Sequence, residues 1–280
     1  MTADHCRARL ALTALCAALT ATLLAACGGS APAAPPPTPA PSPPASLTTP
    51  AAAAPATPQS CTGLPGAQAR WLPMTDGGRL EANTAGSGAV AVVFLHEIGR
   101  AGMCGFAPYA AWLIQHYPVR VVLVNRCGYG QSDCARPTDI FDIRAETEPA
   151  VEWARNNGAR TVTLVGASGG GGDAIDAAAL VPGVSAVVDL SGDTNDANAD
   201  DKALARRVTV PALLAVAPDD PSCSIAIVQS IYAQIAAPVK RLVIESQLPA
   251  VHGWDLLLDG NHEPRPLATV VADWAVRPGT

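Results

Sequence analysis

The chain has 280 residues, of which 49% are apolar and only 15% are charged. This composition excludes a disordered or acidic-tail protein, because such chains combine low hydrophobicity with high net charge. A formal net charge of −6 and an aromatic content of 4% also exclude the basic, aromatic-rich surface of a nucleic-acid-binding protein.

The N-terminus is typical of an export signal. Arg7 and Arg9 precede an uncharged, Ala/Leu-rich segment over residues 10–26, and Cys27 follows two alanines directly. The LAAC motif of residues 24–27 resembles a bacterial lipobox, which implies cleavage before Cys27 and attachment of lipid to its thiol. A retained membrane helix is the alternative, but the apolar segment is at the short end of the ~17–25 residues that a span needs.

A linker is expected after the signal. Between Ser30 and Ser60 the chain contains eleven prolines and no charged residue. Proline removes backbone donors and favours polyproline II, so the segment forms a semi-rigid spacer and no core. We therefore expect a lipoprotein signal over residues 1–26, a linker over 27–60, and a folded domain over 61–280. The lipid would hold this domain at the membrane of the cell envelope, outside the cytoplasm.

Five cysteines belong to the predicted domain. An exported domain lies in an oxidising compartment, so we expect disulfides, although their pairing cannot be read from the sequence. An odd number leaves at least one cysteine outside any disulfide, and no spacing indicates a zinc site or another metal centre. These cysteines are Cys61, Cys104, Cys127, Cys134 and Cys223.

The predicted domain alternates strand and helix signals. A DGG turn at residues 76–78 joins two strands as a hairpin. Continuous apolar runs further along are typical of strands buried on both faces, so the alternation predicts a mostly parallel sheet of eight strands with helices on both faces. The expected strands are 70–75, 79–84, 89–96, 120–125, 161–167, 186–190, 210–217 and 240–245. The expected helices are 109–116, 142–157, 173–180, 199–207, 225–235 and 267–276.

The GASGG sequence of residues 166–170 indicates the chemistry. This GxSxG motif directly follows a predicted buried strand and precedes a predicted helix, which is the context of a nucleophile elbow. The elbow places Ser168 on a sharp, strained turn, where Gly166 and Gly170 crowd together and leave no space for side chains. A dinucleotide loop is excluded because Ser168 stands where GxGxxG needs glycine. A glycine-rich turn without chemistry remains the alternative.

A serine nucleophile needs a base, and the base needs an orienting acid. After an elbow these follow in the order acid, then histidine. We predict His252 as the base, because its loop follows the last strand and so lies on the same rim as the elbow. His262 comes later and is expected at the surface. Asp220, in the loop after the strand over 210–217, is the predicted acid. Two aspartates remain open as alternatives: Asp219, and more weakly Asp193.

The oxyanion of acyl transfer needs preorganised N–H donors. We expect one from the backbone of Gly169, the residue after the nucleophile. The other is expected from Ile98, in the loop after the strand over 89–96. His96 precedes the serine and ends an interior strand, so we interpret it as structural.

Together these motifs resemble the serine esterases of the α/β-hydrolase superfamily from Arg70 to Val276. The stretch NRCGYGQS at residues 125–132 is similar to the superfamily's D-x-R-G-x-G-x-S segment, and the DDP and HG sequences at 219–221 and 252–253 also fit. The resemblance implies the α/β-hydrolase fold, hydrolysis of an ester or related acyl bond through an acyl-enzyme, and no cofactor. The serine argues against the related dehalogenases, which use aspartate, and dienelactone hydrolases, which use cysteine.

The departures from the pattern leave other functions open. Asn125 and Cys127 replace the superfamily's Asp and Arg, and Glu97 replaces the usual glycine after His96. A non-catalytic binding module with this fold is therefore one alternative, and a peptidase or acyltransferase with the same triad is another. Only about twenty residues, in a segment that is polar, separate the strands over 186–190 and 210–217, so we expect no large lid and an open site for a small ester or acyl substrate. The sequence leaves the oligomeric state open.

Overall fold

The computed structural model describes residues 57–99, 101–135, 142–192, 199–248 and 250–279. The predicted signal with Cys27 and most of the predicted linker lie outside the described residues, as do Asp193 and part of the segment where a lid would be inserted. None of the helices in the described ranges combines the length and the apolar character needed to cross a bilayer.

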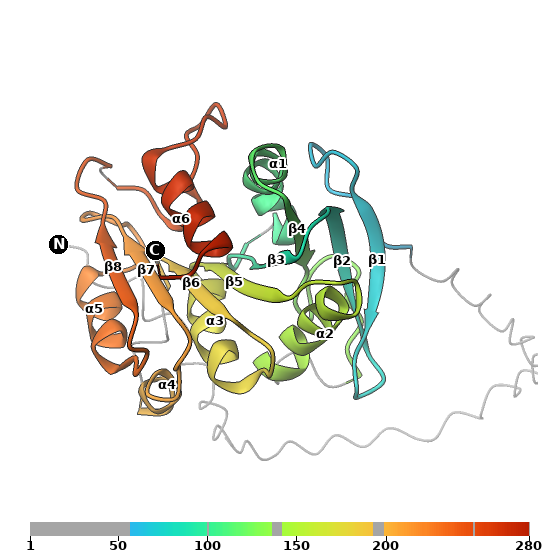
Figure 1. Ribbon diagram of the computed structural model, residues 1–280, viewed down its shortest axis with the longest axis horizontal. Helices are drawn as coiled ribbons and strands as arrows, with labels where there is room; N and C mark the ends of the chain where they lie inside the picture. The colour runs from blue at the N-terminus through green and yellow to red at the C-terminus, as the bar shows by residue number, and fades with distance from the viewer. Residues whose placement is uncertain (1–56, 100, 136–141, 193–198, 249, 280) are drawn as a thin grey trace, which may run out of the picture. The chain divides into compact units, whose positions relative to one another are not determined.

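Eight strands form one sheet, as predicted (Figure 1). Their order is β1-β2-β4-β3-β5-β6-β7-β8, in which β1 pairs antiparallel with β2, β2 pairs antiparallel with β4, and all other pairs are parallel. The carboxyl ends of the parallel strands therefore meet at one edge of the sheet. The strands are β1 (Gln68–Pro73), β2 (Arg79–Gly86), β3 (Val90–Leu95), β4 (Val119–Val124), β5 (Thr161–Ala167), β6 (Ala186–Leu190), β7 (Ala212–Val216) and β8 (Lys240–Ile244).

Helices cover both faces of the sheet and divide the core in two. One apolar cluster lies beneath α1 and α6, and a second lies beneath α2, α3, α4 and α5 (Figure 1). The central strands are buried on both faces, which explains their uninterrupted apolar sequences. The helices are α1 (Ala107–His116), α2 (Ile143–Asn156), α3 (Gly169–Leu180), α4 (Ala199–Ala205), α5 (Ile225–Gln234) and α6 (Pro266–Val276), with 3₁₀ turns η2 (Gly102–Phe106) and η3 (Gly253–Leu256).

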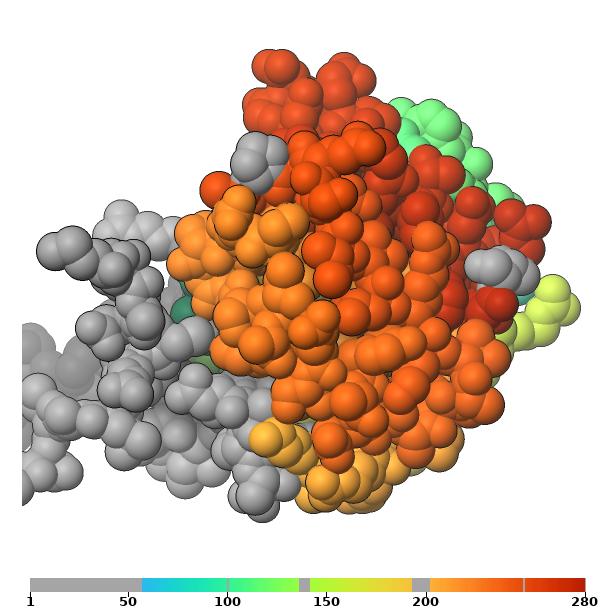
Figure 2. All heavy atoms as spheres, turned by 90° about the vertical axis from the view of Figure 1, so that its left-hand side faces the viewer, coloured from blue at the N-terminus to red at the C-terminus, as the bar shows by residue number. Residues whose placement is uncertain are grey.

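The two ends of the sheet differ. The β1–β2 hairpin forms one end, and its turn uses Gly77 at a φ of 92°, a conformation that favours glycine. At the other end β8 is the edge strand among the described residues and pairs with β7, and α5, β8 and α6 form much of the surface there (Figure 2). Val239 and Ile244, which flank and end β8, are each 40% exposed.

Two disulfides form among the five cysteines of the domain. Cys61 bonds to Cys104, and Cys127 bonds to Cys134. The first joins the segment ahead of β1 to η2, and the second closes a short loop after β4. Cys223 belongs to neither disulfide and is buried, with its thiol donating to the carbonyl of Gly192 at 3.3 Å. The expected odd cysteine is thus Cys223.

Candidate active site

Ser168 occupies the junction between β5 and α3. Its backbone has a φ of 54° and a ψ of −129°, a conformation that non-glycine residues rarely adopt and that costs about 1–3 kcal/mol. The Ser168 N–H donates to the carbonyl of Leu190 at the end of β6, at 2.9 Å. The turn is therefore as sharp as the GxSxG motif predicts, and it is held against the neighbouring strand.

The glycines around Ser168 are required by close backbone contacts. A Cβ at Gly166 would lie 1.8 Å from the Gly170 carbonyl oxygen, and a Cβ at Gly170 would lie 2.2 Å from the Leu95 carbonyl oxygen. Helix α3 begins at Gly169, four residues before the predicted start at Asp173. Glycine is a poor helix former, but tertiary contacts override this preference here. A Cβ at Gly171 would lie 2.3 Å from a carboxylate oxygen of Asp189.

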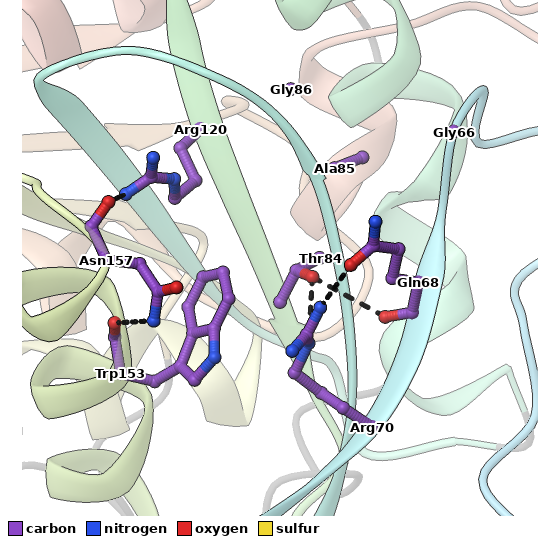
Figure 3. Close-up of a pocket in the computed structure, with 9 residues that line it drawn as sticks. All are labelled: Gly66, Gln68, Arg70, Thr84, Ala85, Gly86, Arg120, Trp153 and Asn157. Atoms are coloured by element: carbon purple, nitrogen blue, oxygen red, sulfur yellow. Dashed lines mark hydrogen bonds between the residues drawn. The ribbon is translucent and has the colours of Figure 1, made fainter.

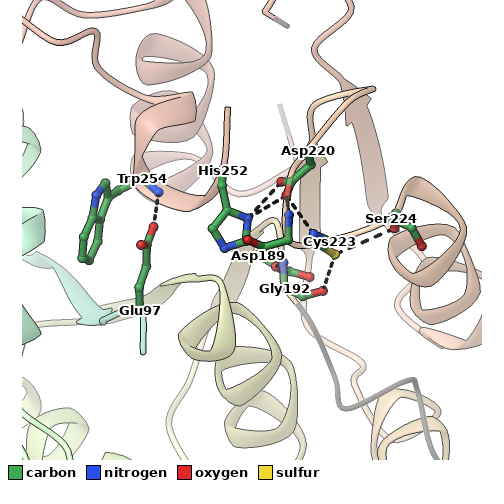
Figure 4. A network of polar contacts seen from close by, with 9 residues as sticks. Glu97, Asp189, Gly192, Asp220, Cys223, Ser224, His252 and Trp254 are labelled. Atoms are coloured by element: carbon green, nitrogen blue, oxygen red, sulfur yellow. Dashed lines mark hydrogen bonds and ion pairs between the residues drawn. The ribbon is translucent and has the colours of Figure 1, made fainter. Parts of the chain in front are cut away.

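Asp220 and His252 meet at the edge where the parallel strands end (Figure 4). His252 precedes η3, and Asp220 follows β7. The imidazole Nδ1 lies 2.8 and 3.0 Å from the two oxygens of the Asp220 carboxylate. The Asp220 side chain is fully buried, whereas that of His252 is 17% exposed. A carboxylate that accepts from Nδ1–H places the lone pair of a neutral imidazole on Nε2, which is the nitrogen that can take up a proton.

The carboxylate of Asp220 is held in the ionised form. Its burial works against this, but hydrogen bonds from His252, from the Ser191 side chain and from the Ser222 N–H bring the pKa of Asp220 below its ordinary value. Oδ1 accepts from the N–H groups of Ser222 and Cys223, each at 2.8 Å. An anchored carboxylate of this kind can orient an imidazole and stabilise its charged form.

The structure also places the alternative acids and bases. Asp219 is exposed, and none of the described residues bonds to its carboxylate; Asp193 lies outside the described residues. His262 is exposed, as expected. His96 is buried, and burial lowers its pKa to about 4. Its Nδ1 contacts the Glu97 carbonyl at 2.6 Å and its Nε2 accepts from Arg126 N–H at 3.3 Å, so it supports the loop after β3.

The two residues predicted to supply the oxyanion donors contact one another through the side chain of Ile98. A Cβ at Gly169 would lie 2.8 Å from Cδ1 of Ile98, so the loop after β3 reaches the elbow. Neither the Gly169 N–H nor the Ile98 N–H donates a hydrogen bond within the described ranges. Between the described residues, no hydrogen bond joins the Ser168 hydroxyl to His252; without substrate such contacts are often long.

Glu97 is a residue of the site to which the motifs gave no role. Its Oε1 accepts from the Trp254 N–H at 2.9 Å, two residues after His252, and a Cβ at Gly253 would lie 1.8 Å from the same oxygen (Figure 4). The Glu97 carboxylate therefore joins the loop after β3 to the loop that carries His252. In the sequence, the one sign of a special role for this residue was that Glu97 stands where the superfamily usually has glycine, directly after His96.

Arg126 is a second residue without an assigned role. Its Nη1 pairs with the Asp173 carboxylate of α3 at 2.7 Å, and both side chains are 14% exposed. The same Nη1 would lie 3.9 Å from a Cβ at Gly169, so a guanidinium group stands beside the elbow. Within the described ranges, no group of three His, Cys, Asp or Glu side chains is arranged to hold a metal ion.

Replacing Glu97 with Gln should stabilise the protein more at neutral than at acid pH. Burial, together with Asp255 and Asp220, raises the pKa of Glu97, although the Trp254 N–H and His252 oppose the shift. A carboxyl whose pKa is raised by folding loses stability as pH rises from its unfolded value through its folded value. Gln does not titrate and still accepts from Trp254.

Thermal unfolding checks this prediction. The Tm difference between Glu97→Gln and the parent chain should be more positive at about pH 7.5 than at about pH 4. Glu263→Gln is the matched control, because Glu263 is exposed. A difference for Glu97→Gln that does not change with pH would contradict the prediction.

Comparisons with known proteins identify the fold. No protein-family model matches the sequence, and no curated protein matches it. Among solved structures, an esterase from Pyrococcus furiosus is similar with a TM-score of 0.61 and 14% identity, over 76% of this chain and 91% of that one. An esterase from Exiguobacterium antarcticum has a TM-score of 0.58 and 17% identity, over 75% of this chain and 100% of that one.

A dienelactone hydrolase from Anabaena variabilis is also similar, with a TM-score of 0.57 and 22% identity, over 75% of this chain and 96% of that one. Together with the strand order and the helices on both faces, these likenesses show that the chain has the α/β-hydrolase fold. At such low identity they show the fold alone.

Proposed function

We propose that the chain is a serine hydrolase that cleaves a carboxylic ester or a related acyl bond. The observation that carries the proposal is the hydrogen-bonded pair of Asp220 and His252, on the same edge of the sheet as the strained Ser168. The esterases and hydrolases among the structural neighbours support the reaction class.

In the proposed mechanism, the Ser168 hydroxyl attacks the acyl carbonyl while Nε2 of His252 takes its proton. Asp220 holds Nδ1–H and stabilises the imidazolium that forms. The N–H groups of Gly169 and Ile98 receive the oxyanion, a contribution of about 3–4 kcal/mol for each donor. His252 then gives its proton to the leaving group, an acyl-enzyme forms on Ser168, and water releases it by the same steps in reverse.

Labelling with a fluorophosphonate probe tests the proposal, because the probe reacts with an activated serine whatever the substrate is. The purified chain should label, and both Ser168→Ala and His252→Ala should abolish labelling. Ser132→Ala is a control, since Ser132 donates its hydroxyl to the Asn125 carbonyl and lies outside the elbow. A folded chain that does not label would instead favour a non-catalytic binding protein.

The acyl acceptor distinguishes the remaining alternatives. A peptidase or an acyltransferase would form the same acyl-enzyme on Ser168 and would label equally well. Turnover of short-chain esters, amides and added alcohol acceptors by the labelled protein separates the three reactions. Ester hydrolysis that exceeds both amide hydrolysis and acyl transfer would support the proposed function.

We also propose that the protein is a lipoprotein of the bacterial cell envelope, a proposal supported by the export signal and the LAAC motif alone. Replacing Cys27 with Ser should move the protein from the membrane fraction to the soluble fraction, because lipid is attached through the thiol. Cys16→Ser is a control within the predicted signal. Membrane fractionation that Cys27→Ser leaves unchanged would favour a retained helix.

A further inference from the structure

A polar hollow of about 280 Å³ lies beside the β1–β2 hairpin, between the sheet and α2 (Figure 3). The start of β1, the end of β2, the start of β4 and the end of α2 line it. These chain positions put it at the edge where the parallel strands begin. Ser168 follows the end of β5, so the hollow is separate from the candidate active site.

Two arginines and a tryptophan form the centre of this hollow. The guanidinium carbons of Arg70 and Arg120 lie 4.7 and 5.9 Å from the ring centroid of Trp153. All three side chains are half-buried. The guanidinium groups are thus fixed in direction by the indole, at distances where cation–π attraction acts.

The charges of both arginines lack a carboxylate partner among the described residues. Arg70 donates through Nε to Thr84 Oγ1 at 2.9 Å and through Nη2 to Gln68 Oε1 at 2.6 Å, and Arg120 donates to the Asn157 carbonyl. Every one of these acceptors is neutral. Two fixed positive charges, with N–H groups to spare, therefore face one hollow in a chain whose net charge is −6.

We propose that this hollow binds an oxyanion, the phosphate or carboxylate group of a small ligand. Planar guanidinium groups with spare donors match such groups in charge and in geometry. The volume is near the lower end of the ~300–1,000 Å³ typical of ligand pockets, which fits one anionic group and a small organic part. The site is independent of ester hydrolysis, so its occupant does not have to be the substrate.

Isothermal titration calorimetry on the purified chain, in buffer free of phosphate, tests the proposal. The probes are phenyl phosphate and benzoate, with phenol as an uncharged control. At least one anion should bind with one-to-one stoichiometry, and phenol should not. Arg70→Gln and Arg120→Gln should each weaken binding about tenfold or more. Arg241→Gln is the matched control, because Arg241 is exposed on β8, the edge strand farthest along the sheet.

The readouts distinguish the proposal from its failure. Absence of binding by both anions would overturn it, as would binding that the two hollow variants leave unchanged. Thermal unfolding of each variant shows that it is folded, and either hollow variant alone is sufficient if the other does not fold. Fluorophosphonate labelling of Ser168 should persist in Arg120→Gln, so failure here is separate from failure of the proposed hydrolase.

A second experiment, with lipid vesicles, shows whether the anion is a lipid headgroup or belongs to a soluble ligand. Sedimentation with phosphatidylcholine vesicles that contain phosphatidic acid, lost in Arg120→Gln, would support the site with a lipid headgroup as its ligand. Binding of phenyl phosphate in solution without vesicle binding would support it with a soluble ligand.

Discussion

Asp220→Asn should lower kcat for ester hydrolysis about 10⁴-fold. The two carboxylate oxygens of Asp220 both accept, whereas an Asn side chain has one accepting oxygen and one donating NH₂ group. Here the NH₂ group would face His252 and donate to Nδ1. The imidazole then carries its proton on Nε2 and can no longer accept one from Ser168. Steady-state kinetics on a short-chain ester measure the effect, and KM should change little because the carboxylate does not touch the substrate.

Asp219→Asn is the matched control for this prediction. Asp219 is adjacent in sequence but exposed, and none of the described residues bonds to its carboxylate. Its replacement should change kcat less than about twofold, since surface charges act weakly through water. A larger loss of kcat for Asp219→Asn than for Asp220→Asn would identify Asp219 as the acid. Equal kcat values for both variants would remove Asp220 from the mechanism.

Gly166→Ala should destabilise the fold by at least about 3 kcal/mol. The added Cβ would lie 1.8 Å from the Gly170 carbonyl oxygen and 2.8 Å from the Gly171 Cα. Both are backbone atoms, so no side chain can rotate away, and α3 must move off the end of β5. Urea unfolding measures the change through the midpoint and slope of the transition.

Gly260→Ala controls for the loss of glycine as such. A Cβ at Gly260 meets no atom within 4 Å, and its φ lies outside the left-handed region. Its replacement should change the free energy of unfolding by no more than about 0.5 kcal/mol. A cost below about 1 kcal/mol for Gly166→Ala would show that the elbow relaxes, whereas failure of that variant to fold would agree with the prediction.

The sheet could be predicted because its strands carry a local signal. Central strands such as β3 and β5 are buried on both faces and therefore appear as unbroken apolar runs. The start of α3 could not be predicted in the same way. Gly169 and the three glycines after it have low helix propensity, and they are helical because α3 approaches β6 and Asp189 closely.

In the candidate site, too, residues within local motifs could be predicted, and residues that depend on long-range contacts could not. Ser168, Asp220 and His252 follow one another in an order that the elbow itself implies, so local motifs were sufficient to propose them as candidates. Glu97 was not assigned, because its partner Trp254 is 157 positions away and no local pattern links the two. Arg70, Arg120 and Trp153 also come from distant segments, and only the fold brings them around one hollow.

The disulfide between Cys61 and Cys104 sets how the domain responds to tension on its N-terminal side. An edge strand that pairs with a single neighbour, as β1 does, is the first to peel when its end is pulled. Here a force applied ahead of Cys61 would pass through the covalent bond directly to η2. Strands β1, β2 and β3 lie between the two cysteines in sequence and so stay out of the load path. Under such a force, elements outside this disulfide loop would unfold first. The β1–β2 hairpin would bear the force only after the Cys61–Cys104 disulfide had been reduced.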